Sequence, residues 1–372
     1  MFISCLLLLT FLVPRIVNGS QDNFIGESIP ATRPFYMGFV PTSYDITPQA
    51  VEKTYRFVHR NADLIAHHIA VGVPWPEALK GQPYHPNVEH ELTFRLLQRK
   101  AGQKLFLYMS PLNIDGEMAG YWGEYENMER PGKWKNRDLD DPETVIAYTN
   151  FCRDLIGRFQ PDYFAYVVEA NLLAFYHPSK WKSFVRFAKQ VYQTIKSENP
   201  TLPVFVSLQI DFFWIDQAAQ ARAISRILPY SDYVAVSAYP YFFGFEDPAT
   251  LPGDFFSRVH DMAPEKPFAV AETGFTAQDV DTLGQHIDGT SRRQKRYLKL
   301  LLKQCLLLDA EFLVWFVPRD YDAFLRKAPL YGVPQEIIDI LLVWRDNGLL
   351  EANGHRRISF TEWTRWLSLP VQ

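Results

Sequence analysis

Eight short apolar runs alternate with longer amphipathic stretches along residues 35–347. The runs have the length of buried strands, and the stretches between them have helical spacing. The expected strands are 35–41, 63–71, 104–110, 163–170, 203–209, 232–238, 267–273 and 311–318. The expected helices are 47–60, 88–100, 142–158, 179–198, 216–227, 252–262, 291–308 and 334–347. Eight strand–helix units predict an α/β fold, a single-domain (β/α)8 TIM barrel.

The competing fold is a doubly wound open sheet, which places a glycine-rich phosphate loop after its first strand. Here that turn reads Phe39-Val40-Pro41-Thr42-Ser43, without glycine. Most of the expected strands are apolar on both faces, as buried parallel strands are. The closed barrel is therefore the preferred architecture.

The N-terminus has the pattern of a secretory signal. Residues 1–13 are almost continuously apolar, and Val17-Asn18-Gly19 offers a cleavage point. The alternative is an uncleaved anchor, but the run from Leu6 to Val13 is short for a bilayer span. We expect a signal peptide at 1–19, a polar leader arm at 20–34 and a barrel domain at 35–372, in a secreted or periplasmic monomer.

Charge and composition limit the partners. The chain has 38 Lys and Arg against 42 Asp and Glu, a net charge of −4, which argues against nucleic acid or an anionic membrane surface as a partner. No Cys/His cluster has metal-ligand spacing, so we expect no metal and no cofactor. Aromatic residues make up 15% of the chain, which suits a large core, an aromatic-lined cleft, or both.

Two carboxylates stand at the ends of expected strands. Glu169 ends the fourth strand and Glu272 ends the seventh. The active site of a barrel lies at the C-terminal ends of its strands. An unpaired charge is costly to bury there, so each Glu must have a polar partner or a functional role that explains its position. Either the two form structural ion pairs, or they are the pair of carboxylates that glycoside hydrolysis requires.

Two aromatic residues accompany this pair. Tyr239 follows the sixth strand and can hydrogen-bond a carboxylate, which favours its ionised form. Trp315 lies on the eighth strand and can stack on a sugar ring. The alternative for both is a place in the core.

Together Glu169, Glu272, Tyr239 and Trp315 resemble the large clan of retaining (β/α)8 glycosidases called clan A, and most closely its endo-β-1,4-galactanase-like polysaccharide hydrolases. The resemblance covers the chain from about Phe35 to the C-terminus, including a tail with Trp363 and Trp366. It implies that Glu169 is the acid/base and Glu272 the nucleophile.

One position departs from the clan pattern. The clan usually has Asn directly before the acid/base, where it contacts the sugar 2-hydroxyl, but Val168 stands there. Asn171 lies two residues after Glu169 and is expected to project to the same side of the strand, although it could instead be a turn residue. If nothing replaces the missing contact, the alternative function is a carbohydrate-binding barrel that is weakly active or inactive.

Further site candidates follow other strands. At most one of His67 and His68 points into the barrel, because neighbouring strand residues face opposite sides, and we take His67 as the cleft residue. Trp75, Trp122 and Asp320 follow strands and are expected to bind sugar, or in the case of the tryptophans to anchor loops.

The predicted function is a retaining glycoside hydrolase that acts on a polysaccharide or oligosaccharide. A chitinase-like barrel with substrate assistance is excluded, because the fourth strand lacks the acidic run that such enzymes carry.

Overall fold

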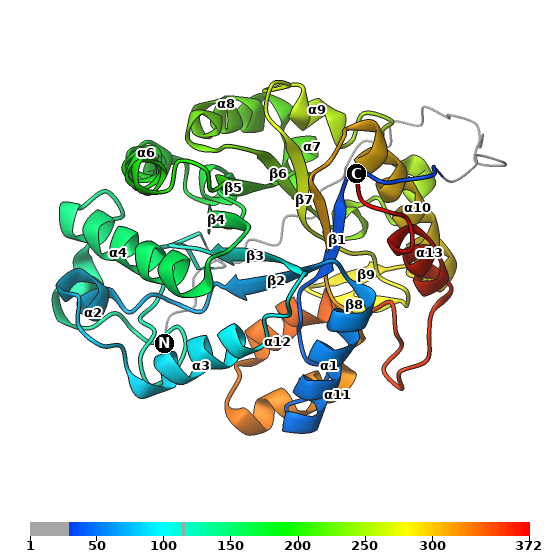
Figure 1. Ribbon diagram of the computed structural model, residues 1–372, viewed down its shortest axis with the longest axis horizontal. Coiled ribbons are helices and arrows are strands. Elements are labelled where there is room, and N and C mark those ends of the chain that lie inside the picture. Colours follow the sequence, from blue (N-terminus) through cyan, green and yellow to red (C-terminus); the bar gives the residue numbers. More distant parts are fainter. Residues whose placement is uncertain (1–29, 114–115) are drawn as a thin grey trace.

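The computed structural model describes residues 30–113 and 116–372, so the expected signal segment and most of the leader arm lie outside the described residues. Eight parallel strands close into a barrel in the order β1-β10-β7-β6-β5-β4-β3-β2 (Figure 1). They are β1 (Tyr36–Phe39), β2 (Leu64–Ile69), β3 (Lys104–Met109), β4 (Tyr163–Val167), β5 (Val204–Gln209), β6 (Val234–Ala238), β7 (Phe268–Thr273) and β10 (Phe312–Trp315). The predicted TIM barrel is confirmed, and each strand lies inside its expected range.

Helices surround the barrel. The longer ones are α1 (Pro48–Asn61), α3 (Pro86–Leu97), α4 (Pro142–Phe159), α6 (Trp181–Glu198), α8 (Gln217–Ile227), α10 (Ser291–Leu307) and α13 (Ile358–Leu367). Shorter ones are α2 (Trp75–Lys80), α5 (Leu172–Tyr176), α7 (Asp211–Ile215), α9 (Ser257–His260), α11 (Asp322–Lys327) and α12 (Gln335–Leu342). A hairpin, β8 (Val280–Thr282) and β9 (Gln285–Ile287), follows β7. The helix expected at 252–262 is reduced to the four residues of α9.

Local sequence explains where the main helices begin. Thr47 accepts a hydrogen bond from the Ala50 N–H, with Pro48 at the first helical position of α1. Asp141 caps α4 in the same way, with Pro142 next to it. Oxygen-bearing caps followed by proline satisfy or remove the free N–H groups of a first turn. Within the described part of the chain, no helix has both the length and the apolar character needed to cross a bilayer.

The helix that completes the barrel is α13, not the one expected at 334–347. The Trp363 ring packs on Phe39 of β1, with ring centroids 4.5 Å apart, and its indole N–H donates to the Asn61 carbonyl at 2.8 Å. Figure 1 shows α13 beside α10, whereas α12 contacts α11 and β8. The segment 334–347 has helical periodicity, but its apolar side belongs to a separate small cluster around Tyr321 and Ile338.

Aromatic rings fill the barrel interior. The rings of Phe106, Phe205 and Phe312 pack together, with centroids 5.0 to 6.2 Å apart. Alanines on the other strands make room for them; these are Ala66, Ala165, Ala235, Ala269 and Ala271. Interleaved large and small side chains give a densely packed centre. Much of the aromatic content is therefore core.

Candidate active site

Glu272 reaches the mouth of the barrel because β7 contains an extra residue. Val236 of β6 pairs with Val270, whereas the next residue, Ser237, pairs with Glu272. Ala271 is left over as a bulge, and it faces the barrel interior. In a regular strand the residue after it would face the outer helices. The bulge redirects Glu272, as bulges beside active sites commonly do.

Two tyrosine hydroxyls hold the Glu272 carboxylate. Tyr108, from β3, donates to Oε2 at 2.8 Å, and Tyr239, after β6, donates to Oε1. Burial raises the pKa of Glu272, and the hydrogen bonds from Tyr239 and Tyr108 offset part of that rise. The contact predicted between Tyr239 and the carboxylate is present in the structure. Tyr108 was missed, although it lies only two residues before the end of the strand expected at 104–110.

Glu169 lies two residues after the end of β4, in a strained backbone conformation. Its φ is +49°, in the left-handed region that residues with a side chain rarely occupy. Its N–H donates to the Ser207 hydroxyl of β5 at 2.8 Å. Burial, followed by the negative charges of Glu272 and Asp211, raises the pKa of Glu169 to about 8, and the Ser237 hydroxyl offsets a part. The strained turn brings Glu169 into electrostatic reach of Glu272.

The two carboxyl groups thus differ in proton affinity. Glu272 has hydroxyl donors that stabilise its charge, and this charge in turn keeps the proton on Glu169. Paired carboxyls whose pKa values are driven apart by their surroundings can act as a proton donor and an anionic nucleophile. The arrangement has the chemical equipment for acid–base and nucleophilic steps on one substrate.

On β2 the prediction chose His67, but the residue that faces the barrel mouth is the next one, His68. His67 is 1% exposed and packs outside the barrel near Tyr55, while His68 stacks on the Tyr108 ring with a centroid distance of 4.4 Å. Burial, then Arg95, lowers the pKa of His68 to about 3, so the ring facing the mouth is neutral.

The same correction applies on β10. Trp315 is fully buried in the outer core, and its indole N–H donates to the Asn347 carbonyl at 2.8 Å. Val314 faces the interior, so the next residue on that face is Phe316, which is partly exposed and packs near Tyr239. Strand alternation makes Phe316, not Trp315, the aromatic ring of this strand at the mouth.

The two tryptophans predicted to bind sugar are buried among protein atoms. Trp75 is fully buried, stacks on Trp134 and donates to the Ala119 carbonyl at 3.1 Å. Trp122 is 3% exposed. Both tryptophans anchor loops, which was the alternative interpretation, and neither offers an open face to a sugar.

Asn171 does not replace the missing Asn of the clan pattern. It is fully buried, and its amide N–H groups donate to the Gln209 carbonyl and the Gln220 side chain at 2.9 and 2.8 Å. The helix α5 begins immediately after it, so the strand geometry assumed for residues 169–171 does not hold. Its side chain turns away from the mouth.

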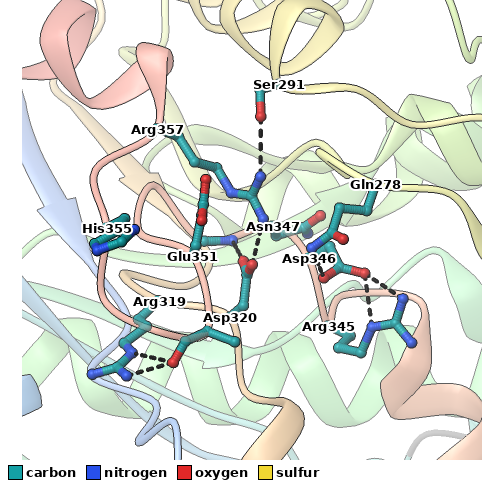
Figure 2. Close-up of polar contacts among 12 residues, drawn as sticks. Gln278, Ser291, Arg319, Asp320, Arg345, Asp346, Asn347, Glu351, His355 and Arg357 are labelled. Atoms are coloured by element: carbon teal, nitrogen blue, oxygen red, sulfur yellow. Dashed lines mark hydrogen bonds and ion pairs between the residues drawn. The ribbon is translucent and has the colours of Figure 1, made fainter.

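Asp320 is held by an ion pair instead of lying free for a ligand. Its carboxylate pairs with Arg357 and accepts a 3.0 Å hydrogen bond from the Gly348 N–H (Figure 2). Both side chains are almost completely buried. Gly348 is required here, because a Cβ would lie 2.3 Å from the Asp320 backbone nitrogen. The prediction that Asp320 binds sugar hydroxyls is wrong in this geometry.

An aromatic rim joins Tyr239 to two residues that were not predicted as site residues, Phe316 and Trp344. Trp344, partly exposed, contacts the Tyr239 and Phe316 rings with centroids 5.5 and 5.9 Å away. These three rings, which we call the mouth aromatics, lie beside Glu272. The position of Phe316 follows from counting outward from Val314, but no sequence signal placed Trp344 at the mouth.

Two groups of described residues have ligand atoms close enough to share a cation. One is exposed on the β8–β9 hairpin: Asp279, His286 and Asp288. In the other, Asp320, Asp322 and Asp346, two of the carboxylates already pair with Arg357 and Arg345 (Figure 2). Neither group includes Glu169 or Glu272.

Comparisons with known proteins support the fold. No family model matches the chain, and no curated protein matches it. Solved structures do match. A fungal β-1,4-galactanase is 14% identical and has a TM-score of 0.57, with 89% of this chain and 99% of that chain covered. A GH53 catalytic domain of Ignisphaera aggregans is 16% identical and has a TM-score of 0.57, with 91% of this chain and 97% of that chain covered. An exo-β-1,4-mannosidase from an Opitutaceae bacterium matches over 90% of this chain and 59% of its own (12%, TM-score 0.64). At these identities the likeness establishes a shared barrel, the fold that the resemblance predicted.

Proposed function

We propose that this protein is a retaining glycoside hydrolase that cleaves O-glycosidic bonds in a polysaccharide or oligosaccharide outside the cytoplasm. The observation that carries the proposal is the pair Glu169 and Glu272, which share one barrel mouth and differ in proton affinity. Galactanases and a mannosidase among the similar structures act on such bonds, and an apolar segment at 1–13 supports export. The mouth aromatics would provide apolar surface for sugar rings.

In the first step Glu272 attacks the anomeric carbon while Glu169 protonates the departing glycosidic oxygen. This step forms a glycosyl ester on Glu272 and releases the leaving sugar as an alcohol. Glu169, now ionised, then removes a proton from water as its oxygen attacks the anomeric carbon. Glu272 leaves as the carboxylate, and the product keeps its anomeric configuration. Tyr108 and Tyr239 support Glu272 each time it is anionic.

The test is a panel of plant, fungal and bacterial glycans with product analysis, using wild type and the variant Glu272→Gln. We expect turnover of at least one glycan by wild type and a loss of at least about a thousandfold in the variant, as for other essential nucleophiles. Proton NMR at early times should show a product with the configuration of the substrate. An inverted first product would contradict the retaining mechanism.

A carbohydrate-binding barrel without turnover is the second candidate. It is favoured by Val168, because Asn171 lies buried elsewhere and does not replace the usual Asn. Calorimetry with the same glycans separates the two functions. Binding with equal, negligible product formation by wild type and Glu272→Gln would establish the binding function and refute the hydrolase.

A further inference from the structure

A continuous set of buried hydrogen bonds connects the segment after Glu169 to Glu272. Asn171 exchanges two bonds with the Gln209 backbone, accepting at 2.7 Å and donating at 2.9 Å. The Gln209 side chain accepts from the Asp211 N–H at 3.0 Å, and Asp211 Oδ2 accepts from the Tyr239 N–H at 2.7 Å. The Tyr239 hydroxyl then donates to Glu272. Asp211 stands at the centre of this path, which crosses the ends of four adjacent strands.

Asp211 is an unusual residue to find at this place. It is fully buried, and its other oxygen, Oδ1, has no hydrogen-bond partner among the described residues. No lysine or arginine of the described chain forms an ion pair with it. A buried carboxylate without a cation beside it is costly, and such arrangements concentrate at functional sites.

Helix capping does not account for Asp211. Although it is the first residue of α7, its carboxylate accepts its hydrogen bond from the N–H of Tyr239, which follows β6. The ionisable groups whose pKa values its charge raises are Glu169 after β4, Tyr241 after β6 and Tyr297 from α10. Of these only Glu169 ionises near neutral pH, so the principal electrostatic partner of Asp211 is the proposed acid/base.

We propose that Asp211 is a positioning residue for the reaction proposed above, fixing the Tyr239 backbone against Glu272 and placing a third buried carboxyl within electrostatic range of Glu169. The first role is geometric and uses Oδ2. The second is electrostatic, because the negative charge of Asp211 opposes loss of the proton that Glu169 must donate. Burial raises the pKa of Asp211 itself to about 7, so the carboxyls of Asp211 and Glu169 ionise in sequence over neutral and mildly alkaline pH.

The two roles are separated by two substitutions. Asp211→Asn keeps an oxygen that can accept from the Tyr239 N–H but removes the charge, and Asp211→Ala removes both. For Asp211→Asn we expect kcat/KM at acidic pH within about threefold of wild type, with the alkaline decline shifted on the order of one unit to lower pH. For Asp211→Ala we expect kcat to fall with little change in KM, because Tyr239 is released. The matched control is Asp216→Asn, which changes an exposed aspartate at the start of α8. It should change neither the alkaline decline of kcat/KM nor kcat.

A second measurement does not need turnover. Carbon-13 NMR of labelled carboxyl groups follows Glu169 and Asp211 directly, with Glu169→Gln and Asp211→Asn assigning the signals. We expect Asp211→Asn to lower the apparent pKa of Glu169. Glu169→Gln should lower that of Asp211 by a smaller amount, because Asp211 ionises first, while Glu169 still carries most of its proton. The second variant changes a partly exposed side chain, so it keeps the test valid if Asp211→Asn does not fold.

The outcomes are distinct. Unchanged titration of both carboxyls in the folded variants, or an equal shift in Asp216→Asn, would overturn the role of Asp211 even if the protein hydrolyses glycans. Reciprocal shifts together with an absence of turnover in wild type would refute the proposed hydrolase and leave the coupling of Asp211 to Glu169 established.

Discussion

The Tyr108 hydroxyl of β3 donates a 2.8 Å hydrogen bond to Oε2 of Glu272 on β7. Because the two strands lie on different sides of the barrel, this bond crosses the mouth and leaves only one other carboxylate oxygen, which Tyr239 occupies. Both donors favour the anionic form of Glu272. Glu272, the proposed nucleophile, is therefore stabilised as an anion without any lysine or arginine among the described residues bonded to it.

Replacing Tyr108 with Phe should slow the reaction and move its acidic limit. A hydrogen bond to a charged group contributes about 1.5–3 kcal/mol, so kcat/KM should fall roughly ten- to a hundredfold. The loss of the donor raises the pKa of Glu272, so activity should decline at a higher pH on the acidic side. The control is Tyr192→Phe, which removes a tyrosine–carboxylate bond to Asp232 away from the mouth. An unchanged acidic limb in Tyr108→Phe would contradict the assignment of Glu272.

The alkaline limit of activity should report Glu169. Its pKa is raised to about 8, so the proton needed by the leaving group is present below that pH and is lost as pH rises through it. We expect kcat/KM to decline above about pH 8. Glu169→Gln should remove this limb and lower kcat/KM by about 10²–10⁴ for a sugar leaving group. For an aryl glycoside, whose phenolate leaves without a proton, kcat/KM of Glu169→Gln should fall less. An equal fall for both substrates would argue against a proton-donor role of Glu169.

The barrel could be predicted from the sequence because its signals are local. Strand and helix lengths, proline and oxygen-bearing caps and apolar runs are read within a few residues, and all eight strands were found. The closing helix was misassigned because periodicity identifies a helix without showing which apolar cluster it joins. Trp363 and Phe39, in contact across the ends of the barrel, are separated by more than three hundred residues.

The site residues could be predicted only where the face of the strand on which each side chain lies was known. Choosing His67 over His68, and Trp315 over Phe316, are both errors of one residue, which reverses the face of a strand. Glu272 escaped this error because its position was inferred from strand ends. The bulge that makes it face the mouth is a property of pairing with Ser237, which a single strand does not contain. Asp211 depends on tertiary contacts to Gln209 and Tyr239 and carried no local signal.

Trp344 should contribute to substrate binding. Its partly exposed ring packs edge-on against Tyr239 and Phe316, next to Glu272. Aromatic contacts contribute about 0.5–1.5 kcal/mol, so Trp344→Ala should raise KM about two- to tenfold with a smaller effect on kcat. Tyr331→Ala is the control, since Tyr331 is an exposed aromatic in the same segment after β10. Similar KM values for Trp344→Ala and wild type would exclude Trp344 from the substrate site.

The buried pair Asp320–Arg357 should matter for stability and not for sugar binding. Removing one member of a buried ion pair leaves the other charge unpaired, at a cost of about 3–5 kcal/mol. Asp320→Ala should therefore lower the free energy of unfolding by that amount in urea denaturation, and the double variant Asp320→Leu/Arg357→Met should recover much of it. Glu52→Ala, which breaks an exposed pair with Arg56, should cost at most about 1 kcal/mol.

Because the Asp320 oxygens are engaged by Arg357 and Gly348, the KM of Asp320→Ala, measured at a temperature where the variant is folded, should stay near the wild-type value. A raised KM with unchanged stability would instead restore the prediction that Asp320 binds a sugar hydroxyl.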